Sequence, residues 1–294
     1  IGLVGSEMCI RDSYKAADET YYKILVPEKN SKGKGVRKGY LWVVVGINTR
    51  MIYLLYDDGS RSERVILNEL GSCKGIIQSD GYSPYRKLES DAYPNITRIP
   101  CLQHIKRKFI DCGEKDPDAK RIVELINALY QNEHKHKVGV DGWTVEQNLM
   151  HRKKYAPDIL GEIKDVLDEI EERGDLLPKS ELQEAITYLR NEWNAVVDIF
   201  NYGDTYLDNN MVERMNRYIS LSRKNSLFFG SHKGAERGAI LYTIALTCRM
   251  HKVNLFEYLT DVINRTAEWQ PNTPIEKYLS LIHISEPTRP ISIS

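Results

Sequence analysis

Three carboxylates stand out because each occupies a place from which a fold could aim it into one cleft. Asp80 ends a short apolar run, residues 75–80, and Gly81 follows directly. A buried strand of this kind delivers its last side chain to the carboxyl edge of a sheet, where open α/β folds bind ligands. Asp18 lies near the start of an aromatic, β-branched stretch, and Glu213 lies beside the apolar stripe of a helical stretch. Clustered carboxylates hold Mg²⁺ well, and Mg²⁺ suits phosphodiester cleavage.

The elements that must position these carboxylates follow from hydrophobic periodicity. Strands are predicted at 16–26, 40–47 and 51–56, the last two joined as a hairpin, with a basic, glycine-rich loop at 30–39. A helix at 63–70, strands at 75–80 and 95–100, and a helix at 102–111 come next. Three antiparallel strands followed by βα units with right-handed crossovers predict an α/β fold of the ribonuclease-H-like type, a mixed sheet with flanking helices.

Between residues 118 and 200 the periodicity is helical throughout, which predicts an all-helical insertion. Ser180 and Gln183 fit a capping box at the start of its last helix, whose predicted core includes Trp193, Val196 and Val197. The insertion is acidic: residues 158–204 hold 13 acidic and 4 basic side chains. An ordinary solvated helical face explains this better than an acidic binding surface.

After the insertion, Asp208 is a good N-cap for a helix whose apolar stripe is Val212, Met215 and Ile219. A basic loop with a short extended piece is predicted at 222–230, and helices at 235–250 and 255–267 close the fold. The expected organisation is therefore a catalytic core at 14–112 and 205–279, interrupted by the insertion at 113–204. Residues 1–13 and 280–294 resemble translated sequencing-adapter DNA, so we expect both to be artefacts of a truncated gene.

Bulk composition narrows the class of protein. The 294 residues carry a net charge of +0, but residues 214–237 hold 6 basic side chains against one acidic. The neutral net charge of the chain therefore conceals a basic segment that is suited to binding nucleic acid. The five cysteines are scattered without a CxxC pair, as in reduced intracellular proteins. No apolar run is long enough to span a membrane and no signal peptide is evident, so we expect a cytoplasmic, nucleoid-associated protein with no membrane partner.

Basic residues near the carboxylates are the candidates for holding DNA phosphates. For Lys106, Arg107 and Lys108 this interpretation and a solvated surface are evenly matched, whereas Arg223 and Lys224 favour DNA contact. His104 forms a CxxH spacing with Cys101, but no second pair completes a zinc site, so a satisfied or substrate-facing histidine is favoured. The full predicted DNA-binding set is His104, Lys106, Arg107, Lys108, Arg214, Arg217, Arg223, Lys224 and Asn225.

Five short motifs occur in an order that resembles the catalytic core of the insertion sequence 66 family of DDE transposases, from about residue 14 to 259. They are Asp18-Glu19-Thr20, Ser79-Asp80-Gly81-Tyr82, residues 101–109, residues 208–214 and residues 223–228. Each motif is weak alone, and the five in order are specific. One departure is Leu102, where the family has tryptophan after the first cysteine.

The resemblance implies a ribonuclease-H-like enzyme that cleaves and joins DNA, with Asp18, Asp80 and Glu213 as catalytic and metal-binding residues. The metal would be Mg²⁺, with Mn²⁺ as a substitute; two ions would be held with Asp80 between them. Water would attack first, and the freed 3′-hydroxyl would then attack target DNA. The family usually carries an amino-terminal zinc-binding and DNA-end-binding region that this sequence lacks, as expected of a truncated protein. A homo-oligomer in the DNA complex is expected from the resemblance alone.

Three alternatives compete with this interpretation. A truncated, non-catalytic DNA-binding relic would bind DNA without cleaving it, and the presence of all three carboxylates counts against it. Another ribonuclease-H-like nuclease, such as a resolvase, would share the acidic cluster but lack the Asp208–Arg214 helix pattern and the long insertion. A glycosidase with paired carboxylates would lack the basic loop at Arg223 and Lys224.

Overall fold

The computed structural model describes residues 10, 12–28, 33, 35–113, 116–136, 138–140, 142–267 and 269. The chain forms two compact units. We call the first the strand unit, which comprises Ile1–Ile77, Lys87–Thr97 and Asn210–Ser294. The second, the helical unit, comprises Gln78–Arg86 and Arg98–Asn209.

A mixed five-stranded sheet with the order β3-β2-β1-β4-β5 confirms the predicted α/β class. β1 pairs antiparallel with β2, and β2 pairs antiparallel with β3, as the sequence predicted. Each predicted strand is present to within a few residues at its ends. The strands are β1 (Lys15–Leu25), β2 (Val36–Gly46), β3 (Ile52–Leu55), β4 (Gly75–Ser79) and β5 (Ile96–Pro100).

β1 and β2 form a ribbon paired over eleven residues, from Lys15 opposite Gly46 to Leu25 opposite Val36. The prediction of a loop at 30–39 is therefore wrong for residues 36–39, which are the first residues of β2. Residues 29–32 and 34 lie outside the described part of the chain. The charged side chains of Arg37 and Lys38 suggested a loop, but a two-stranded ribbon accommodates exposed charges on its strands.

The free edge of β3 is closed by side chains instead of another strand. The backbone N–H groups of Ile52 and Leu54 donate to the hydroxyls of Thr247 and Thr243, at 3.2 and 2.9 Å. Both threonines are buried on α9 (His232–Met250). Unpaired edge groups would otherwise be costly to bury or open to pairing with another chain.

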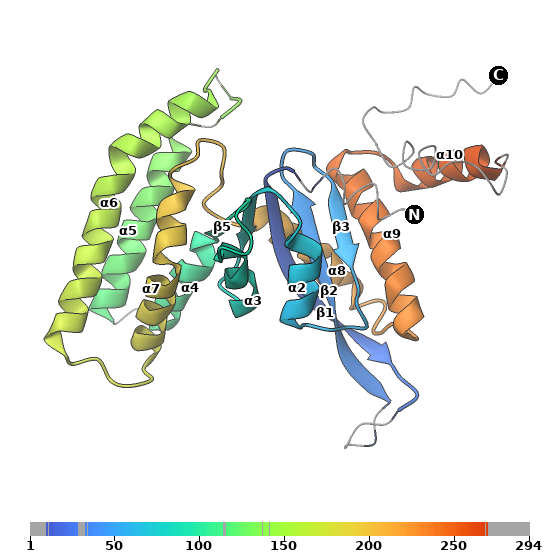
Figure 1. The fold of residues 1–294 in the computed structure, drawn as a ribbon. Coiled ribbons are helices and arrows are strands. Elements are labelled where there is room, and N and C mark those ends of the chain that lie inside the picture. The colour runs from blue at the N-terminus through green and yellow to red at the C-terminus, as the bar shows by residue number, and fades with distance from the viewer. Residues whose placement is uncertain are drawn as a thin grey trace. The chain divides into compact units, whose positions relative to one another are not determined.

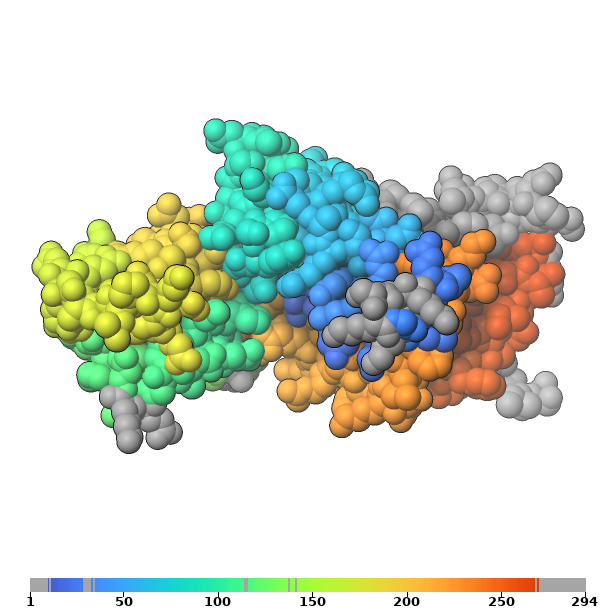
Figure 2. Space-filling view, turned by 90° about the horizontal axis from the view of Figure 1, so that it is seen from below, coloured from blue at the N-terminus to red at the C-terminus, as the bar shows by residue number. Residues whose placement is uncertain are grey.

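The strand unit also contains several helices around this sheet. α8 packs on β1 and β2, and α9 packs on β3. α10 follows α9 and lies against it, which can be seen in the orange and red segments of Figures 1 and 2. Besides α9, these elements are α2 (Glu63–Leu70), the short 3-10 helix η1 (Lys87–Glu89), α8 (Asn210–Ser222) and α10 (Leu255–Ala267).

The segment that follows α8 is extended in part, as predicted. Phe229 forms a parallel bridge to Ile24, its N–H donates to the Lys23 carbonyl at 2.8 Å, and its carbonyl accepts from the Leu25 N–H at 2.8 Å. The Phe229 ring lies 4.3 Å from the ring of Tyr22, centroid to centroid. The chain after α8 is therefore tied to the edge of β1.

The helical unit is all-helical between residues 102 and 199 apart from its loops, which confirms the predicted periodicity. α4 packs on α5 and α7, and α5 packs on α6; Figure 1 shows the long helices side by side. Its helices are α3 (Ser83–Arg86), α4 (Leu102–Asp111), α5 (Pro117–His134), α6 (Val145–Arg173) and α7 (Glu181–Ile199).

Two local predictions in this unit need correction. The Ser180 hydroxyl does cap α7 by accepting the Gln183 N–H, but the Gln183 side chain accepts from Lys179, so the box is half formed. A complete capping box occurs instead at Thr144 and Gln147. Val197 was predicted in the core of α7 and is 37% exposed; Glu192 and Ile199 are buried on that helix.

The ends of the chain are described only in part. Residues 280–294 and most of 1–13 lie outside the described residues, although Ile10 is buried with 3% exposure. Four cysteines in the described part, Cys73, Cys101, Cys112 and Cys248, carry free thiols. No helix among the described residues has the length and apolar character needed to cross a membrane.

Candidate active site

Asp18 lies in β1, opposite Val43 of β2, and its carboxylate is held on both oxygens. Oδ1 accepts the backbone N–H of Glu19 at 2.8 Å, and Oδ2 accepts the side-chain amide of Asn216 at 2.5 Å. The side chain is half-buried. Carboxylate oxygens are ligands that Mg²⁺ prefers, so the Asp18 side chain has the chemistry of a metal ligand.

Asn216 belongs to α8, the helix that carries Glu213. The predicted stripe of Val212, Met215 and Ile219 is buried, which fixes how α8 rolls on the sheet. Residues three apart on a helix share a face, so Glu213 lies one turn from Asn216 on the same side of α8. The hydrogen bond from Asn216 to Asp18 therefore turns the Glu213 side of α8 toward the Asp18 region of β1.

The start of α8 differs by one residue from the prediction. The helix begins at Asn210, so the N-cap position is Asn209, and Asp208 lies one residue before it. The register of the helix is unaffected because its buried stripe is the predicted one.

Asp80 directly follows β4 and lies in the helical unit. Its Oδ1 accepts the backbone N–H of Tyr82 at 3.1 Å, so the carboxylate closes its own turn. The Gly81 N–H donates to the hydroxyl of Tyr188 on α7, at 2.8 Å. A Cβ on Gly81 would lie 2.5 Å from that hydroxyl oxygen, so only glycine fits against Tyr188 here.

Tyr188, which lies beside the Asp80 turn, is a residue of the candidate site that the sequence did not indicate. Burial raises the pKa of its hydroxyl, and the carboxylates of Glu192 and Asp80 raise it further, so the group stays protonated. The Lys108 ammonium lies 5.7 Å from the centre of its ring. Nothing in the helical pattern distinguishes Tyr188 from a surface tyrosine, because its role depends on the Asp80 turn reaching α7.

Behind Tyr188 a buried ion pair fixes the same helix. Arg98 of β5 donates to Glu192 of α7, and both side chains are inaccessible to solvent. Arg86, at the end of the short helix after the Asp80 turn, lies 3.9 Å from the other Glu192 oxygen. The insertion therefore supports the Asp80 turn, in addition to presenting the solvated acidic face that the sequence favoured.

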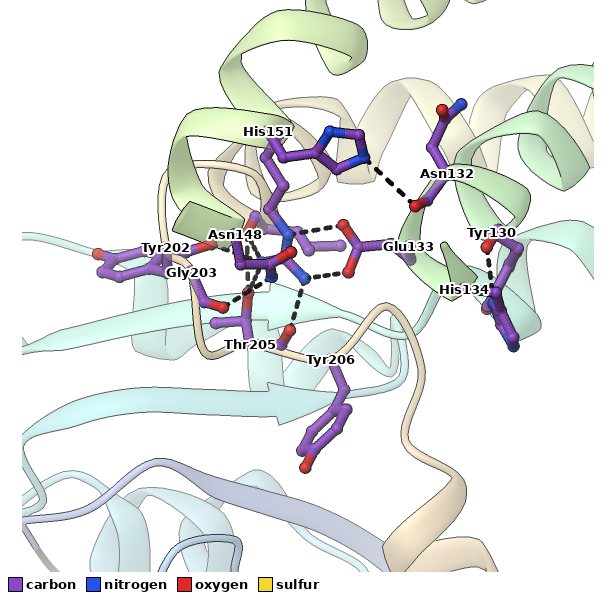
Figure 3. Close-up of polar contacts among 12 residues, drawn as sticks. Tyr130, Asn132, Glu133, His134, Asn148, His151, Tyr202, Gly203, Thr205 and Tyr206 are labelled. Carbon is purple, nitrogen blue, oxygen red and sulfur yellow. Dashed lines mark hydrogen bonds and ion pairs between the residues drawn. The ribbon is translucent and has the colours of Figure 1, made fainter. Parts of the chain in front are cut away.

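A second buried arginine, Arg152 of α6, holds the segment between α7 and α8. Its guanidinium binds both oxygens of Glu133 at 2.7 and 2.8 Å, and donates to the carbonyls of Ile199, Tyr202 and Thr205. Figure 3 shows Glu133, Tyr202 and Thr205, three of the residues that Arg152 contacts, together with Asn148 bound to the Gly203 carbonyl. The chain that leads to the Glu213 helix is thus anchored in the helical unit.

The predicted DNA-binding residues lie on two helices and the loop after the second. On α4, Arg107 and Lys108 are exposed, and His104 and Lys106 are half-buried. Cys101, which precedes α4, is buried, and its sulfur accepts the Asn209 N–H at 3.2 Å. On α8, Arg214 and Arg217 are exposed; beyond it, Lys224 and Asn225 are exposed and Arg223 is half-buried.

Comparison with known proteins shows which protein family this sequence resembles. A sequence model described as "Transposase IS66 family" matches residues 6–237. Similar curated proteins come from Sinorhizobium fredii (strain NBRC 101917 / NGR234) and are described as uncharacterized proteins. The protein y4jD is 29% identical over 70% of this chain and 40% of its own length, and y4qI is 28% identical over 88% and 49%. The chain therefore spans half or less of the length of these relatives.

Proposed function

The chain belongs to the IS66 transposase family, and on that premise we propose that it cleaves and joins DNA strands with Asp18, Asp80 and Glu213. The observation that carries the proposal is the hydrogen bond from Asn216 to Asp18, because it turns the helix of Glu213 toward β1. Asp80 follows β4, the neighbour of β1 in the sheet order. We further propose that the sheet is of the ribonuclease-H-like type, which the order β3-β2-β1-β4-β5 supports.

The three side chains fit a hard divalent cation. All are carboxylates, whose oxygens are the ligands that Mg²⁺ prefers, and all are half-buried. Bound Mg²⁺, with Mn²⁺ as a substitute, would stabilise the charge on the attacking and leaving oxygens of the phosphodiester. The protein's part is to aim the carboxylates and to hold the DNA.

Different groups orient the side chains of Asp18 and Asp80. Asn216 donates to Oδ2 of Asp18 and so fixes the plane of that carboxylate. Asp80 is fixed through its backbone: its turn closes on the Tyr82 N–H, and Tyr188 holds the next residue, Gly81. Groups that orient metal ligands in this way commonly change metal affinity or activity by about 10–100-fold when removed.

The DNA is held, in this proposal, by the exposed basic residues of α4 and α8 and by the loop after α8. The partner is DNA at the ends of the element and at the target, and a homo-oligomer would form on it. Five basic residues, Arg107, Lys108, Arg214, Arg217 and Lys224, are exposed to solvent, as is the neutral Asn225. Cations contact phosphates without reading sequence, so these residues would position DNA and not select it.

The test is strand cleavage and strand transfer on a duplex that carries the end of the element, with and without Mg²⁺. Asp18→Asn, Asp80→Asn and Glu213→Gln should each abolish the reaction while thermal unfolding and DNA binding are retained. Asp91→Asn, which removes an exposed carboxylate of the strand unit, is the matched control and should leave activity unchanged. Metal-independent cleavage, or cleavage that survives Asp80→Asn, would sink the proposal. DNA binding without cleavage by the unmodified protein would indicate a non-catalytic relic.

A further inference from the structure

The outer half of the β1–β2 ribbon carries a row of tyrosines and cations on one face. Directly paired residues of an antiparallel ribbon share a face, as do residues two apart along a strand. Tyr21 is paired with Tyr40 and Lys23 with Lys38, so all four share one face. Two cations from elsewhere in the strand unit join them. We call the set the tyrosine–cation ladder: Tyr21, Lys23, Lys38, Tyr40, Arg61 and Arg223.

Three of the four cations of the ladder, Lys38, Arg61 and Arg223, lie over the tyrosine rings. Arg223 is 4.2 Å and Lys38 4.4 Å from the ring centre of Tyr21, and Arg223 also donates to the Tyr21 carbonyl at 2.5 Å. Lys38 and Arg61 each lie 5.2 Å from the ring centre of Tyr40. Ring faces attract cations and restrict where they point, so the ladder presents its positive charge in a defined place.

Three of the four cations have no carboxylate partner within the described residues. Arg61 pairs with Glu19, at 2.5 Å, whereas Lys23, Lys38 and Arg223 form no ion pair there. Lys23 and Lys38 are exposed and Tyr21 is 41% exposed. Neighbouring cations that have no carboxylate partner among the described residues are suited to a repeating anion, and the repeating anion that the proposed function supplies is the DNA backbone.

We propose that the tyrosine–cation ladder binds the phosphate backbone of duplex DNA, an inference that rests on the proposed function. The ladder extends the predicted contact at Arg223 along the ribbon to Lys38 and Lys23, residues that no sequence motif singled out. Because cations already lie over the ring of Tyr21, the tyrosines anchor cations and are not platforms for stacked bases. Binding through the ladder should therefore be independent of sequence.

The experiment measures binding of the whole chain to a fluorescein-labelled duplex of arbitrary sequence across a range of salt concentrations, without divalent metal. The Lys23→Gln, Lys38→Gln double variant should lower the slope of log affinity against log salt by about 2, because each lost phosphate contact removes about 0.9. The matched control is Lys120→Gln with Lys164→Gln, which removes the same charge from exposed positions of the helical unit and should leave the slope unchanged.

Several outcomes would overturn the inference. An unchanged slope in the ladder variant, an equal change in the control, or a duplex that the unmodified chain does not bind would each do so. Tighter binding of single-stranded DNA that is lost in Tyr21→Leu would also do so, because it would indicate base stacking. Loss of fold is monitored by thermal unfolding, and Tyr21→Phe, which keeps the ring, should bind duplex DNA like the unmodified chain.

The test is separable from that of the proposed function. Asp80→Asn should abolish cleavage and leave the salt slope intact, whereas the ladder variant should change the slope. Cleavage that depends on Asp80 together with an unchanged slope in the ladder variant would reject the ladder and keep the enzyme. A changed slope without any cleavage would keep the ladder as a DNA-binding surface and reject the catalytic proposal.

Discussion

The two units of this protein hold some of their cations in different ways. In the helical unit, three arginines, one of them exposed, pair with carboxylates: Arg98 with Glu192, Arg152 with Glu133, and Arg121 with Glu169. In the strand unit, Lys38 and Arg223 lie over tyrosine rings without an ion pair in the described part of the chain. A cation that is paired with a carboxylate is already neutralised. A cation that lies over a tyrosine ring keeps its net charge and can still bind a phosphate.

The same contrast holds for the aspartates. In the strand unit, Asp18 is held directly, by a side-chain amide of the neighbouring helix. In the helical unit, the Asp80 carboxylate accepts a hydrogen bond within its own turn, and Tyr188 of α7 binds the backbone N–H of the next residue, Gly81. A direct contact acts on the carboxylate itself, whereas an indirect one acts through the backbone. The first should therefore matter more to chemistry.

The largest expected effect is at Arg152, where a paired cation is buried. Arg152→Met should lower the free energy of unfolding by about 3–5 kcal/mol, because Glu133 and the carbonyls of Ile199, Tyr202 and Thr205 lose their donor. Urea unfolding followed by circular dichroism measures the change. Lys153→Met, on the next position of α6 and exposed, is the control and should change stability by less than about 0.5 kcal/mol. Equal losses in the two variants would mean that burial of the pair is not what matters.

The second effect concerns catalysis in the strand unit. Asn216→Ala should lower the rate of metal-dependent strand cleavage by about 10–100-fold, because Asp18 loses the donor that orients it. The rate is measured on the end-bearing duplex across Mg²⁺ concentrations, and part of the loss should be recovered at high Mg²⁺. Ser220→Ala, also on α8, removes a hydroxyl whose one bond within the described part of the chain is to the Arg217 carbonyl, and it should leave the rate unchanged. Full activity of the Asn216→Ala protein would show that the hydrogen bond from Asn216 to Asp18 does not contribute to cleavage.

Much of this architecture could be predicted from sequence because it depends on local patterns. The helix at 63–70 and the helix at 102–111 begin and end at the predicted residues, and the buried stripe of α8 is the predicted one. An amphipathic pattern is set by each helix's own residues and survives in any fold that buries one face. Val197 was wrongly placed in the core because its pattern permits burial, whereas the packing of α7 instead buries Glu192.

The contacts that build the site are different, because they join residues far apart in the sequence. Asp18 and Asn216, Gly81 and Tyr188, and Arg98 and Glu192 are separated by 198, 107 and 94 positions. A buried glutamate looks like a surface residue until its arginine is placed beside it. Motif resemblance supplied Asp18, Asp80 and Glu213, but it supplied neither Asn216, which bonds to Asp18, nor Tyr188, which bonds to the residue after Asp80.

The smallest effect tests the indirect contact in the helical unit. Tyr188→Phe should lower the free energy of unfolding by about 1 kcal/mol, because the Gly81 N–H loses its acceptor while the ring remains. Strand cleavage should fall less than in Asn216→Ala, since the Asp80 carboxylate keeps its bond to the Tyr82 N–H.

Gly81→Ala should lower the free energy of unfolding more than Tyr188→Phe does, because its Cβ meets the Tyr188 hydroxyl. Combining Gly81→Ala with Tyr188→Ala should restore part of the lost stability. If Tyr188→Phe impaired cleavage more than Asn216→Ala, the helical unit would be the part that tunes the chemistry, and the contrast between direct and indirect support would be reversed.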